Sequence, residues 1–292
     1  TMKTRLIKIS YLIFLVATVL VSCSDDELSS EEQFNLDVAL IDEYISVNNL
    51  QNVKTTPSGL RYISNSIGNG EFHAQGEYAV VHYEGKRTDG TIFDTSLDGD
   101  PFTFQVATGS VIAGFDEGVR NINIEASGTI IIPSYLGYGS GGSGSIKANE
   151  VLVFDIEVLS EMQILLLDLE KMDEYLSTSS LSNILDTQSG ILYEITTAGA
   201  GDNVKTGDDV SINYKGYLLN GVVFDQNTTG TFDYTVGTDG LIEGWVEAVS
   251  LLNKGAKGTF VIPSTLCYGR TGFNTIPPNT VLIFDIEIID IK

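Results

Sequence analysis

Apolar side chains recur at helical spacing in two separate stretches of the chain. In the first, Leu36, Leu40 and Tyr44 follow one another every four residues. The second spaces its apolar residues by four, three and four, at Leu165, Leu169, Met172 and Leu176. Such spacing places these side chains on one face of an α-helix, so we predict two amphipathic helices. Ser29 and Glu32 predict a capping box at the start of the first helix. We favour helices that pack on their own domain or act as spacers, with dimerisation or the binding of another protein as the alternative.

Outside these helices the chain alternates short apolar runs with turns. The strand-like runs cover residues 78–83, 129–132, 151–159, 210–214, 259–262 and 281–291. Asp89-Gly90 and Asn220-Gly221 are typical of tight hairpin turns. A short helical pattern interrupts each set of strands, at residues 115–122 and 245–252. Many strands with one short helix predict an α+β fold, in which an antiparallel sheet wraps around that helix.

The second half of the chain repeats the first. Ser58-Gly59-Leu60-Arg61-Tyr62 returns as Ser189-Gly190-Ile191-Leu192-Tyr193, at an offset of 131 residues. Later matches such as Tyr138 with Tyr268 have an offset of 130, so one residue is missing from the middle of the second repeat. A register shared over this length indicates duplication. We therefore predict an acidic tether and helix at 23–54, domain 1 at 55–160, a linker helix at 161–186 and domain 2 at 187–292.

The first residues have the pattern of an export signal. Lys3, Arg5 and Lys8 precede an almost purely apolar segment, 9–21, that is too short to span a bilayer comfortably. This pattern predicts a signal peptide over residues 1–22. The segment ends in Ser22-Cys23 and resembles the bacterial lipobox, which implies that Cys23 becomes a lipidated N-terminus and anchors the protein in the outer membrane. An ordinary signal peptide with an incidental cysteine is the alternative.

Charge narrows the classes of partner. The 292 residues carry 16 Lys and Arg against 39 Asp and Glu, for a formal net charge of -23. A protein this acidic lacks the basic surface that displaces counterions from phosphate, which argues against nucleic acid. It also lacks electrostatic attraction to an anionic membrane, so attachment depends on Cys23. The acidic residues 25–27 indicate either export to the cell surface or a solvated tether, which leaves the periplasmic and the cell-surface face open.

Several kinds of catalytic chemistry lack the residues that they need. The chain has two histidines, His73 and His82, and Asn213 takes the place of His82 in the second repeat. A histidine triad or metal site is therefore not what the repeats share, and we expect no metal and no cofactor. Both histidines are expected at the surface or on strands, and Cys267 as a small buried residue. Residues 139–144 match a nucleotide-binding glycine pattern, but a strand follows them instead of a helix, so we predict a flexible loop.

What both repeats do share is a set of apolar and aromatic residues around one acid. In domain 2 these are Tyr214, Phe224, Asp225, Phe232, Tyr234, Leu241, Ile242, Trp245, Tyr268, Ile276 and Phe284. A well-packed core is one interpretation. Their order, however, resembles the FKBP-type peptidyl-prolyl cis-trans isomerases, through Val210-Ser211-Ile212-Asn213-Tyr214-Lys215-Gly216, Phe224-Asp225, Leu241-Ile242-Glu243-Gly244-Trp245 and Ile276-Pro277-Pro278-Asn279. The resemblance covers nearly all of residues 187–292, and domain 1 carries the same order.

The resemblance implies a proline-binding pocket and assigns roles to its residues. Trp245 would form the floor under the proline ring, with Tyr214, Phe224, Tyr234 and Phe284 as walls. The backbone N–H of Ile242 and the hydroxyl of Tyr268 would each bind a substrate carbonyl. Asp225 would face the twisting amide or hold Tyr214 in place, with a simple turn acid as the alternative. The implied catalytic residues are Tyr214, Asp225 and Tyr268, and the implied substrate-binding residues are Phe224, Phe232, Tyr234, Leu241, Ile242, Trp245, Ile276 and Phe284.

Domain 1 departs from this pattern at two places. Phe115 replaces the floor tryptophan, and Ile146-Lys147-Ala148-Asn149 after a Gly/Ser run replaces the segment with two prolines. We therefore expect a looser loop and a smaller floor in domain 1. Its implied pocket consists of Tyr83, Phe93, Asp94, Phe102, Phe104, Val111, Ile112, Phe115, Tyr138, Ile146 and Phe154.

The resemblance also implies a reaction that needs no nucleophile, metal or cofactor, which fits a site with one acid and no shared histidine. We expect a lipid-anchored isomerase that helps proline-containing polypeptide clients to fold outside the cytoplasm, with domain 2 as the more active copy. The alternative from another class is a binding module that holds clients in the same pockets with little or no turnover.

Overall fold

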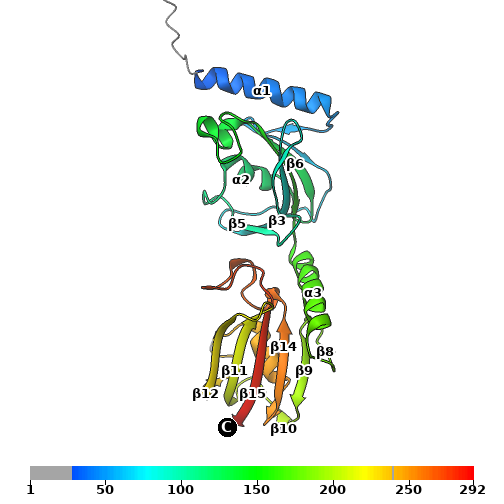
Figure 1. The fold of residues 1–292 in the computed structure, drawn as a ribbon, viewed down its shortest axis with the longest axis vertical. Coiled ribbons are helices and arrows are strands. Elements are labelled where there is room, and N and C mark those ends of the chain that lie inside the picture. The colour runs from blue at the N-terminus through cyan, green and yellow to red at the C-terminus, as the bar shows by residue number, and fades with distance from the viewer. Residues whose placement is uncertain (1–27, 239) are drawn as a thin grey trace, which may run out of the picture.

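The computed structural model of the chain describes residues 28–238 and 240–292. The predicted signal peptide, Cys23 and the acidic residues 25–27 lie outside these residues. Helix α1 (Ser30–Val47) lies at one end, and helix α3 (Glu161–Thr178) lies between two sheet domains that follow one another along the long axis (Figure 1). Across the described part of the chain, no helix is both long and apolar enough to cross a membrane.

Domain 1 is one antiparallel sheet wrapped on a short helix. Its strands are β1 (Lys54–Thr55), β2 (Arg61–Ser64), β3 (Tyr78–Arg87), β4 (Ile92–Thr95), β5 (Phe102–Gln105), β6 (Ser127–Ile132) and β7 (Leu152–Val158). They pair in the order β1-β2-β6-β7-β3-β4, and β5 also pairs with β3. Helix α2 (Ala113–Val119) lies against this sheet, and two short 3-10 turns, η1 (Ser134–Leu136) and η2 (Gly139–Gly141), follow β6.

Domain 2 repeats this architecture. Its main sheet has the order β12-β11-β15-β14-β9-β8, and a separate pair joins β10 to β13. The strands are β8 (Leu185–Asp186), β9 (Leu192–Thr197), β10 (Ala200–Asn203), β11 (Asp209–Leu218), β12 (Val223–Thr235), β13 (Asn253–Lys254), β14 (Lys257–Ile262) and β15 (Leu282–Ile291). Its remaining elements are helix α4 (Glu243–Ser250) and the turns η3 (Ser264–Leu266) and η4 (Gly269–Thr271). The predicted α+β fold with two similar domains is confirmed, although α2 and α4 each begin two residues earlier than predicted.

The missing residue of the second repeat lies between two strands of domain 1. Asp94 and Asp225 still match at an offset of 131, whereas Phe102 and Phe232 match at 130. In domain 1 this stretch is a loop between β4 and β5 that contains Pro101, which cannot donate a ladder hydrogen bond. In domain 2 the shorter stretch is part of a single strand, β12. The shorter stretch in domain 2 is thus continuous strand where domain 1 has a loop.

Each domain carries a helix on the outer face of its sheet, opposite the core. On α1, Ile41 is fully buried against Ile131 and Val153. On α3, Met172 packs in the same way against Val261 and Ile283 of domain 2. The prediction that α1 packs on its own domain is confirmed, but the predicted face is partly wrong: Leu36 and Leu40 are 48% and 45% exposed, and Ile41 makes the contact. Burying one apolar face of an amphipathic helix in this way is what stabilises it in a protein.

A buried aspartate ties each of these helices to a 3-10 turn. Asp37 on α1 accepts bonds from the N–H and the hydroxyl of Ser134, both at 2.7 Å. Asp168 on α3 accepts the same two bonds from Ser264, at 2.8 and 2.6 Å. Burial raises the pKa of Asp168, and these two bonds oppose that shift. Each repeat unit therefore includes its own helix.

Both long helices begin with a capping box. Helix α3 also packs against domain 1. Ser29 caps α1 with Glu32 as predicted, and Ser160 caps α3 with Gln163. Near its start, Ile164 of α3 is buried against Val80 of domain 1. Helix α3 thus packs on domain 1 with its first turn and on domain 2 further along, so it is more than a spacer.

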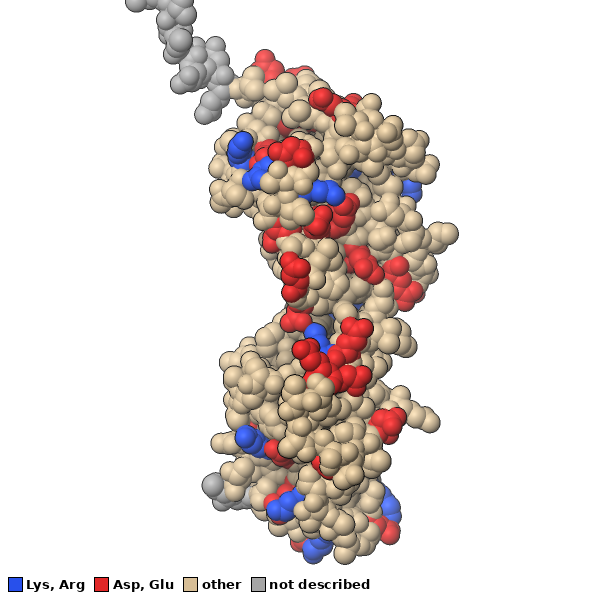
Figure 2. All heavy atoms as spheres, turned by 45° about the vertical axis from the view of Figure 1, so that its right-hand side comes forward, with Lys and Arg blue, Asp and Glu red and all other residues tan. Residues whose placement is uncertain are grey.

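Acidic side chains are spread over both domains and the junction between them. Figure 2 shows Asp and Glu along the whole visible face, with fewer Lys and Arg among them. Many like charges at the surface repel other copies of the same chain, which favours solubility.

Candidate active site

Trp245, the predicted floor of the domain 2 pocket, lies on helix α4. Its side chain is only 4% exposed, and its ring centroid lies 5.1 Å from those of Tyr214 and Phe284. Both rings meet it nearly at right angles, at 82° and 77°, which is a favourable edge-to-face arrangement. The indole Nε1 donates a 3.0 Å hydrogen bond to the hydroxyl of Tyr234. The structure therefore brings the predicted floor and walls together in one aromatic cluster.

Tyr214 and Asp225 form the polar pair of this cluster. They stand on the neighbouring strands β11 and β12, and the Tyr214 hydroxyl donates to Oδ2 of Asp225 at 2.8 Å. Burial, followed by this bond, raises the pKa of Tyr214 to about 12. The phenol is therefore protonated at neutral pH. Because Asp225 lies within β12, the alternative of a simple turn acid is wrong.

Gly216 lets two aromatic walls approach the sheet closely. A Cβ at this position would lie 2.6 Å from the ring of Phe224 and 2.8 Å from that of Phe284. Gly85 has the same place in domain 1, where a Cβ would lie 2.7 Å from Phe154. No side chain fits at such distances, so the glycine is part of the pocket's construction. The sequence indicated Gly216 only as one position in a motif.

Leu241 and Ile242 lie just before helix α4. Ile242 is the N-cap residue, and its carbonyl accepts from the N–H groups of Trp245 and Val246. Among the described residues, no hydrogen bond uses the N–H of Ile242 itself. The first N–H groups of a helix have no partner inside the helix, so this donor is free for a substrate carbonyl. Its predicted role remains a prediction.

Tyr268 and Ile276 belong to the loop beside the pocket. The ring of Tyr268 stacks on Phe273 at 4.9 Å between centroids, and Phe273 and Ile276 exchange two backbone hydrogen bonds. Burial raises the pKa of Tyr268, and the neighbouring Cys267 and the charge on Asp225 raise it further. Sequence reasoning missed Phe273. The sequence did hold a signal, which is a difference between the two repeats: domain 2 has Phe273 where domain 1 has Ser143.

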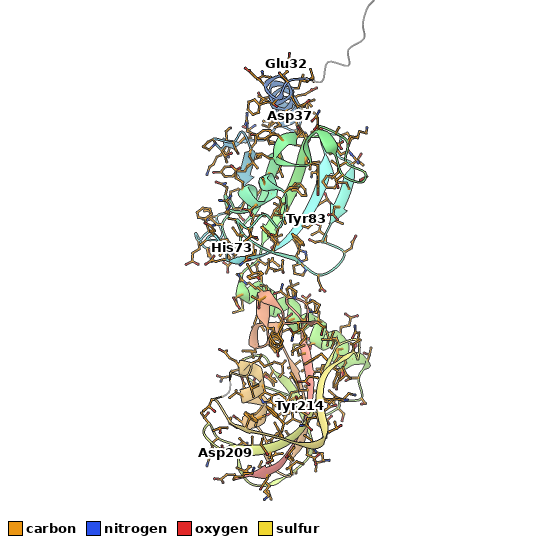
Figure 3. The ribbon with its side chains drawn as sticks, turned by 90° about the vertical axis from the view of Figure 1, so that its left-hand side faces the viewer. Glu32, Asp37, His73, Tyr83, Asp209 and Tyr214 are labelled. Atoms are coloured by element: carbon orange, nitrogen blue, oxygen red, sulfur yellow. The ribbon has the colours of Figure 1, made fainter. Side chains whose placement is uncertain are left out.

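The predicted pocket residues of domain 1 have the same arrangement but lack the hydrogen bond that joins Trp245 to Tyr234 in domain 2. Tyr83 donates to Asp94 at 2.7 Å, and burial together with that bond raises the pKa of Tyr83. Phe115 on α2 lies 5.1 Å from Phe154 and 5.6 Å from Phe104. Phe115 and Phe104 take the places of Trp245 and Tyr234, which are hydrogen-bonded to each other in domain 2. Figure 3 shows Tyr83 in the half of domain 1 that lies nearer to domain 2.

The other predicted residues of this pocket are also gathered in the structure. Phe93 meets Phe154 edge-on at 5.6 Å, and Phe102 stacks on Phe104 at 5.9 Å. Val111 and Ile112 pack against the same core, in which Ile146 is 8% exposed, while Tyr138 at 39% is more open.

The loop over the domain 1 pocket keeps the internal backbone bonds of its counterpart, and the expectation of a looser loop remains a prediction. Ser143 and Ile146 exchange two backbone bonds, and the N–H of Asn149 donates to Gly139 at 2.8 Å. In domain 2, Phe273 with Ile276 and Asn279 with Gly269 form the matching bonds. Arg87 adds a bond to the Ser145 carbonyl. Residues 139–144 begin with the turn η2 and lead into this loop.

The two histidines and Cys267 were also predicted individually. His73 was expected at the surface or on a strand, but it lies in a loop and is only 5% exposed. Its Nδ1 lies 3.6 Å from a carboxylate oxygen of Glu77, and it lines a cavity that Tyr268 and Arg270 of domain 2 also line. These tertiary contacts are not indicated by any local pattern. His82 does lie on β3. Cys267 is partly buried, and burial raises the pKa of its thiol, so little reactive thiolate forms at neutral pH.

Among the described residues, no three His, Cys, Asp or Glu side chains gather as ligands for a metal ion.

Comparisons with known proteins point to one family. The model of the family "FKBP-type peptidyl-prolyl cis-trans isomerase" matches residues 70–159 and 201–289. FkpA, an FKBP-type isomerase of Escherichia coli, is 41% identical over 106 residues, which cover 36% of this chain and 39% of FkpA. Human peptidyl-prolyl cis-trans isomerase FKBP10 is 31% identical over 221 residues, covering 74% of this chain and 34% of FKBP10.

One solved structure also aligns with part of the chain. The crystal structure of FkpA from Escherichia coli aligns with a TM-score of 0.39 and 34% identity, over 42% of this chain and 58% of that one. In each of these comparisons the match spans less than two thirds of the relative's own length.

Proposed function

The chain belongs to the family of FKBP-type peptidyl-prolyl cis-trans isomerases, and from this premise we propose that it isomerises X-Pro peptide bonds in polypeptide clients. One observation carries the proposal. The Tyr214–Asp225 pair stands at an aromatic pocket whose floor is the buried Trp245. A pocket of this kind accepts a proline ring through apolar contact and leaves polar groups at its edge for the backbone.

The energetics of the peptide bond explain why such a pocket suffices. Resonance makes the bond partly double, with a barrier to rotation of about 18–20 kcal/mol. Twisting the amide removes that resonance and with it part of the charge separation. A dry apolar wall formed by Trp245, Phe224 and Phe284 disfavours the more polar planar state. The rotation therefore needs no nucleophile and no proton transfer.

Hydrogen-bond donors at the edge of the pocket hold the substrate during the rotation. The free N–H of Ile242 and the hydroxyl of Tyr268 each bind one substrate carbonyl. A phenol with a raised pKa stays protonated and remains a donor. Asp225 accepts from Tyr214 and fixes the orientation of that ring against the proline. Donors fixed before the substrate arrives cost little reorganisation.

We propose that domain 2 is the more active copy. Its floor tryptophan is anchored by Tyr234 and its Tyr268 is stacked on Phe273, whereas domain 1 has Phe115, Phe104 and Ser143 at the corresponding places. Domain 1 keeps the Tyr83–Asp94 bond and an aromatic cluster around Phe115. This favours a second role for domain 1, in which it holds proline-containing clients with little turnover.

We also propose a location. The residue pattern over 1–23 supports lipidation at Cys23 and attachment to the outer membrane, where the protein would assist the folding of extracytoplasmic clients. The test is the Cys23→Ala variant expressed in a Gram-negative cell. The parent should partition into detergent with a lipid-sized mass increase on its N-terminus, and the variant should do neither. A parent without lipid would refute the anchor and leave the isomerase proposal standing.

The isomerase proposal is tested with the full chain on an X-Pro tetrapeptide. The parent should accelerate cis-trans exchange, and the double variant Asp94→Ala with Asp225→Ala should lose most of that acceleration. The matched control changes two exposed acids of the helices, Asp42→Ala with Asp173→Ala, and should stay active. No acceleration by the parent chain would refute the proposal.

A further inference from the structure

The loop beside the domain 2 pocket is also fastened to domain 1. At its start, Arg270 donates to the carbonyl of Tyr78 on β3 and to Glu161 on α3, both at 3.3 Å. At its end, Nδ2 of Asn279 donates to the hydroxyl of Thr103 on β5 at 2.8 Å. Figure 1 shows this loop between the two domains, beneath β5. The intervening prolines are therefore held against the edge of domain 1.

A groove of about 590 Å³ is lined jointly by domain 1 and by the two prolines of this loop. One wall contains Tyr83 and Phe102, and the other contains Pro277 and Pro278 of domain 2. We name it the composite groove. Tyr83 and Phe102 also belong to the proline pocket of domain 1, so the groove continues that pocket toward domain 2. Phe102 is 37% exposed and offers an apolar contact there.

The wall from domain 2 is rigid. Proline fixes its own φ angle and donates no backbone hydrogen bond, so Pro277 and Pro278 present a preset apolar surface. Asn279 follows at a φ of 50°, and its N–H donates to Gly269 at 2.8 Å. A wall fixed in advance lowers the ordering cost of binding an extended peptide.

The composite groove also carries an available negative charge. It contains Asp98 and Asp100, and Asp100 pairs with Lys171 on α3 at 2.6 Å. Asp98 is exposed, and within the described part of the chain no ion pair or side-chain hydrogen bond engages it. A basic side chain that enters the groove therefore finds a free carboxylate.

We propose that the composite groove binds the residues that flank a proline held in domain 1, and that it favours clients with a basic residue beside that proline. The inference rests on the proposed function, because it needs a proline in the domain 1 pocket. It adds that domain 2 supplies part of the client-binding surface of domain 1 and so contributes to its selectivity.

The experiment measures peptide binding to domain 1 alone, within the full chain. Phe115→Trp combined with Trp245→Phe moves the single tryptophan of the chain from the domain 2 floor to the domain 1 floor. Its fluorescence then reports peptides that enter domain 1. The titrants are Pro-containing peptides in which each residue flanking the proline is Lys, Ala or Glu in turn. If this pair of changes disturbs folding, as seen by circular dichroism, the amide shifts of Gly99 and Thr103 in the unchanged chain report the same titration.

The expected result has two parts. Lys peptides should bind about two- to fivefold tighter than Glu peptides at low salt, the range for an exposed ion pair, and high salt should reduce the difference. Asp98→Asn should abolish this preference, while Asp42→Asn on the opposite side of domain 1 should retain it. Pro277→Ala with Pro278→Ala should weaken all peptides by about two- to fivefold because the wall loses rigidity. Pro57→Ala, an exposed proline elsewhere in domain 1, should leave affinity unchanged.

Other outcomes overturn the proposal. Tighter binding after the two proline changes would mean that the prolines occlude domain 1 and do not complete its surface. If the preference for Lys peptides persists in Asp98→Asn, the carboxylate of Asp98 is not its cause and the proposed selectivity is refuted. If no peptide binds domain 1 while the parent still isomerises X-Pro bonds, the composite groove is refuted and the proposed function stands. If peptides bind domain 1 as expected but the parent shows no isomerase activity, the proposed function fails and the groove remains.

Discussion

The indole Nε1 of Trp245 donates a 3.0 Å hydrogen bond to the hydroxyl of Tyr234, and both side chains are buried. In domain 1 the same two places hold Phe115 and Phe104, which meet edge-on at 5.6 Å without a hydrogen bond. The floor of one pocket is therefore fixed by a directional bond and that of the other by apolar contact alone. This difference is the clearest physical distinction between the two copies.

We predict that Tyr234→Phe destabilises domain 2. The variant keeps the ring but leaves the buried indole N–H without this acceptor, which costs about 1–3 kcal/mol. Trp245 fluorescence should follow unfolding in urea with a lower midpoint, and isomerase activity should fall as the floor loosens. Tyr193→Phe, on strand β9 of the same sheet, is the matched control and should shift the midpoint less. Equal midpoints for Tyr234→Phe and the parent would show that the bond contributes nothing to stability.

The second prediction separates the two domains within the intact chain. Asp225→Ala removes the acceptor of the Tyr214 hydroxyl, and Asp94→Ala removes that of Tyr83. A hydrogen bond to a charged group contributes about 1.5–3 kcal/mol, so losing it from an active site should lower kcat/KM about tenfold or more. We expect this loss with Asp225→Ala and a much smaller loss with Asp94→Ala, measured on one X-Pro peptide. Equal losses would contradict the assignment of domain 2 as the more active copy.

The third prediction concerns the space at Gly216. A methyl group here would lie 2.6 Å from the Phe224 ring, so Gly216→Ala must displace an aromatic wall. Overpacking of this kind costs about 1–3 kcal/mol, and activity should fall with it. The control is Gly141→Ala, because a Cβ at Gly141 meets nothing within 4 Å. Thermal unfolding followed through Trp245 and the isomerase rate are the two measurements. A Gly216→Ala variant as stable as the control would refute the close-packing argument.

Local pattern and internal repetition explain why much of the fold was predictable. The four-residue spacing through Leu36 and Leu40 is a property of one helix, and the Ser29–Glu32 box is complete within four residues. The pocket residues were also predictable, because the order of aromatic residues around Asp225 recurs around Asp94. Features of this kind need no knowledge of distant contacts.

The remaining features depend on residues that are far apart in the chain. The bond between Asn279 and Thr103 joins two domains, and neither residue differs in pattern from an ordinary loop or strand position. The stacking of Phe273 on Tyr268 depends on the path of a loop, although Phe273 itself is 54% exposed. Strand β12 is continuous at the place where domain 1 has one more residue and Pro101. Such features depend on tertiary contacts, and these contacts cannot be predicted from a single sequence.

His73 is the most deeply buried of the chain's two histidines, and its charge state is coupled to the junction. Burial is the main cause that lowers the pKa of His73 below its ordinary 6.5, and the positive charge of Arg270 lowers it further. Glu77, whose carboxylate lies 3.6 Å from Nδ1, opposes the shift. His73 therefore stays neutral in the folded protein at a pH where it already binds a proton in the unfolded chain.

The fourth prediction follows from the sign of this shift. When the unfolded state binds more protons than the folded state, stability falls as pH falls. The contribution of His73 should be fully present above pH 6.5 and should decline below it, by at most about 1.4 kcal/mol per pH unit, down to the folded pKa. His73→Gln should remove this part of the decline, because glutamine does not titrate. The measurement is the urea midpoint of the full chain between pH 8 and pH 5. A His73→Gln variant whose midpoint declines in parallel with that of the parent would show that protonation of His73 is not coupled to folding.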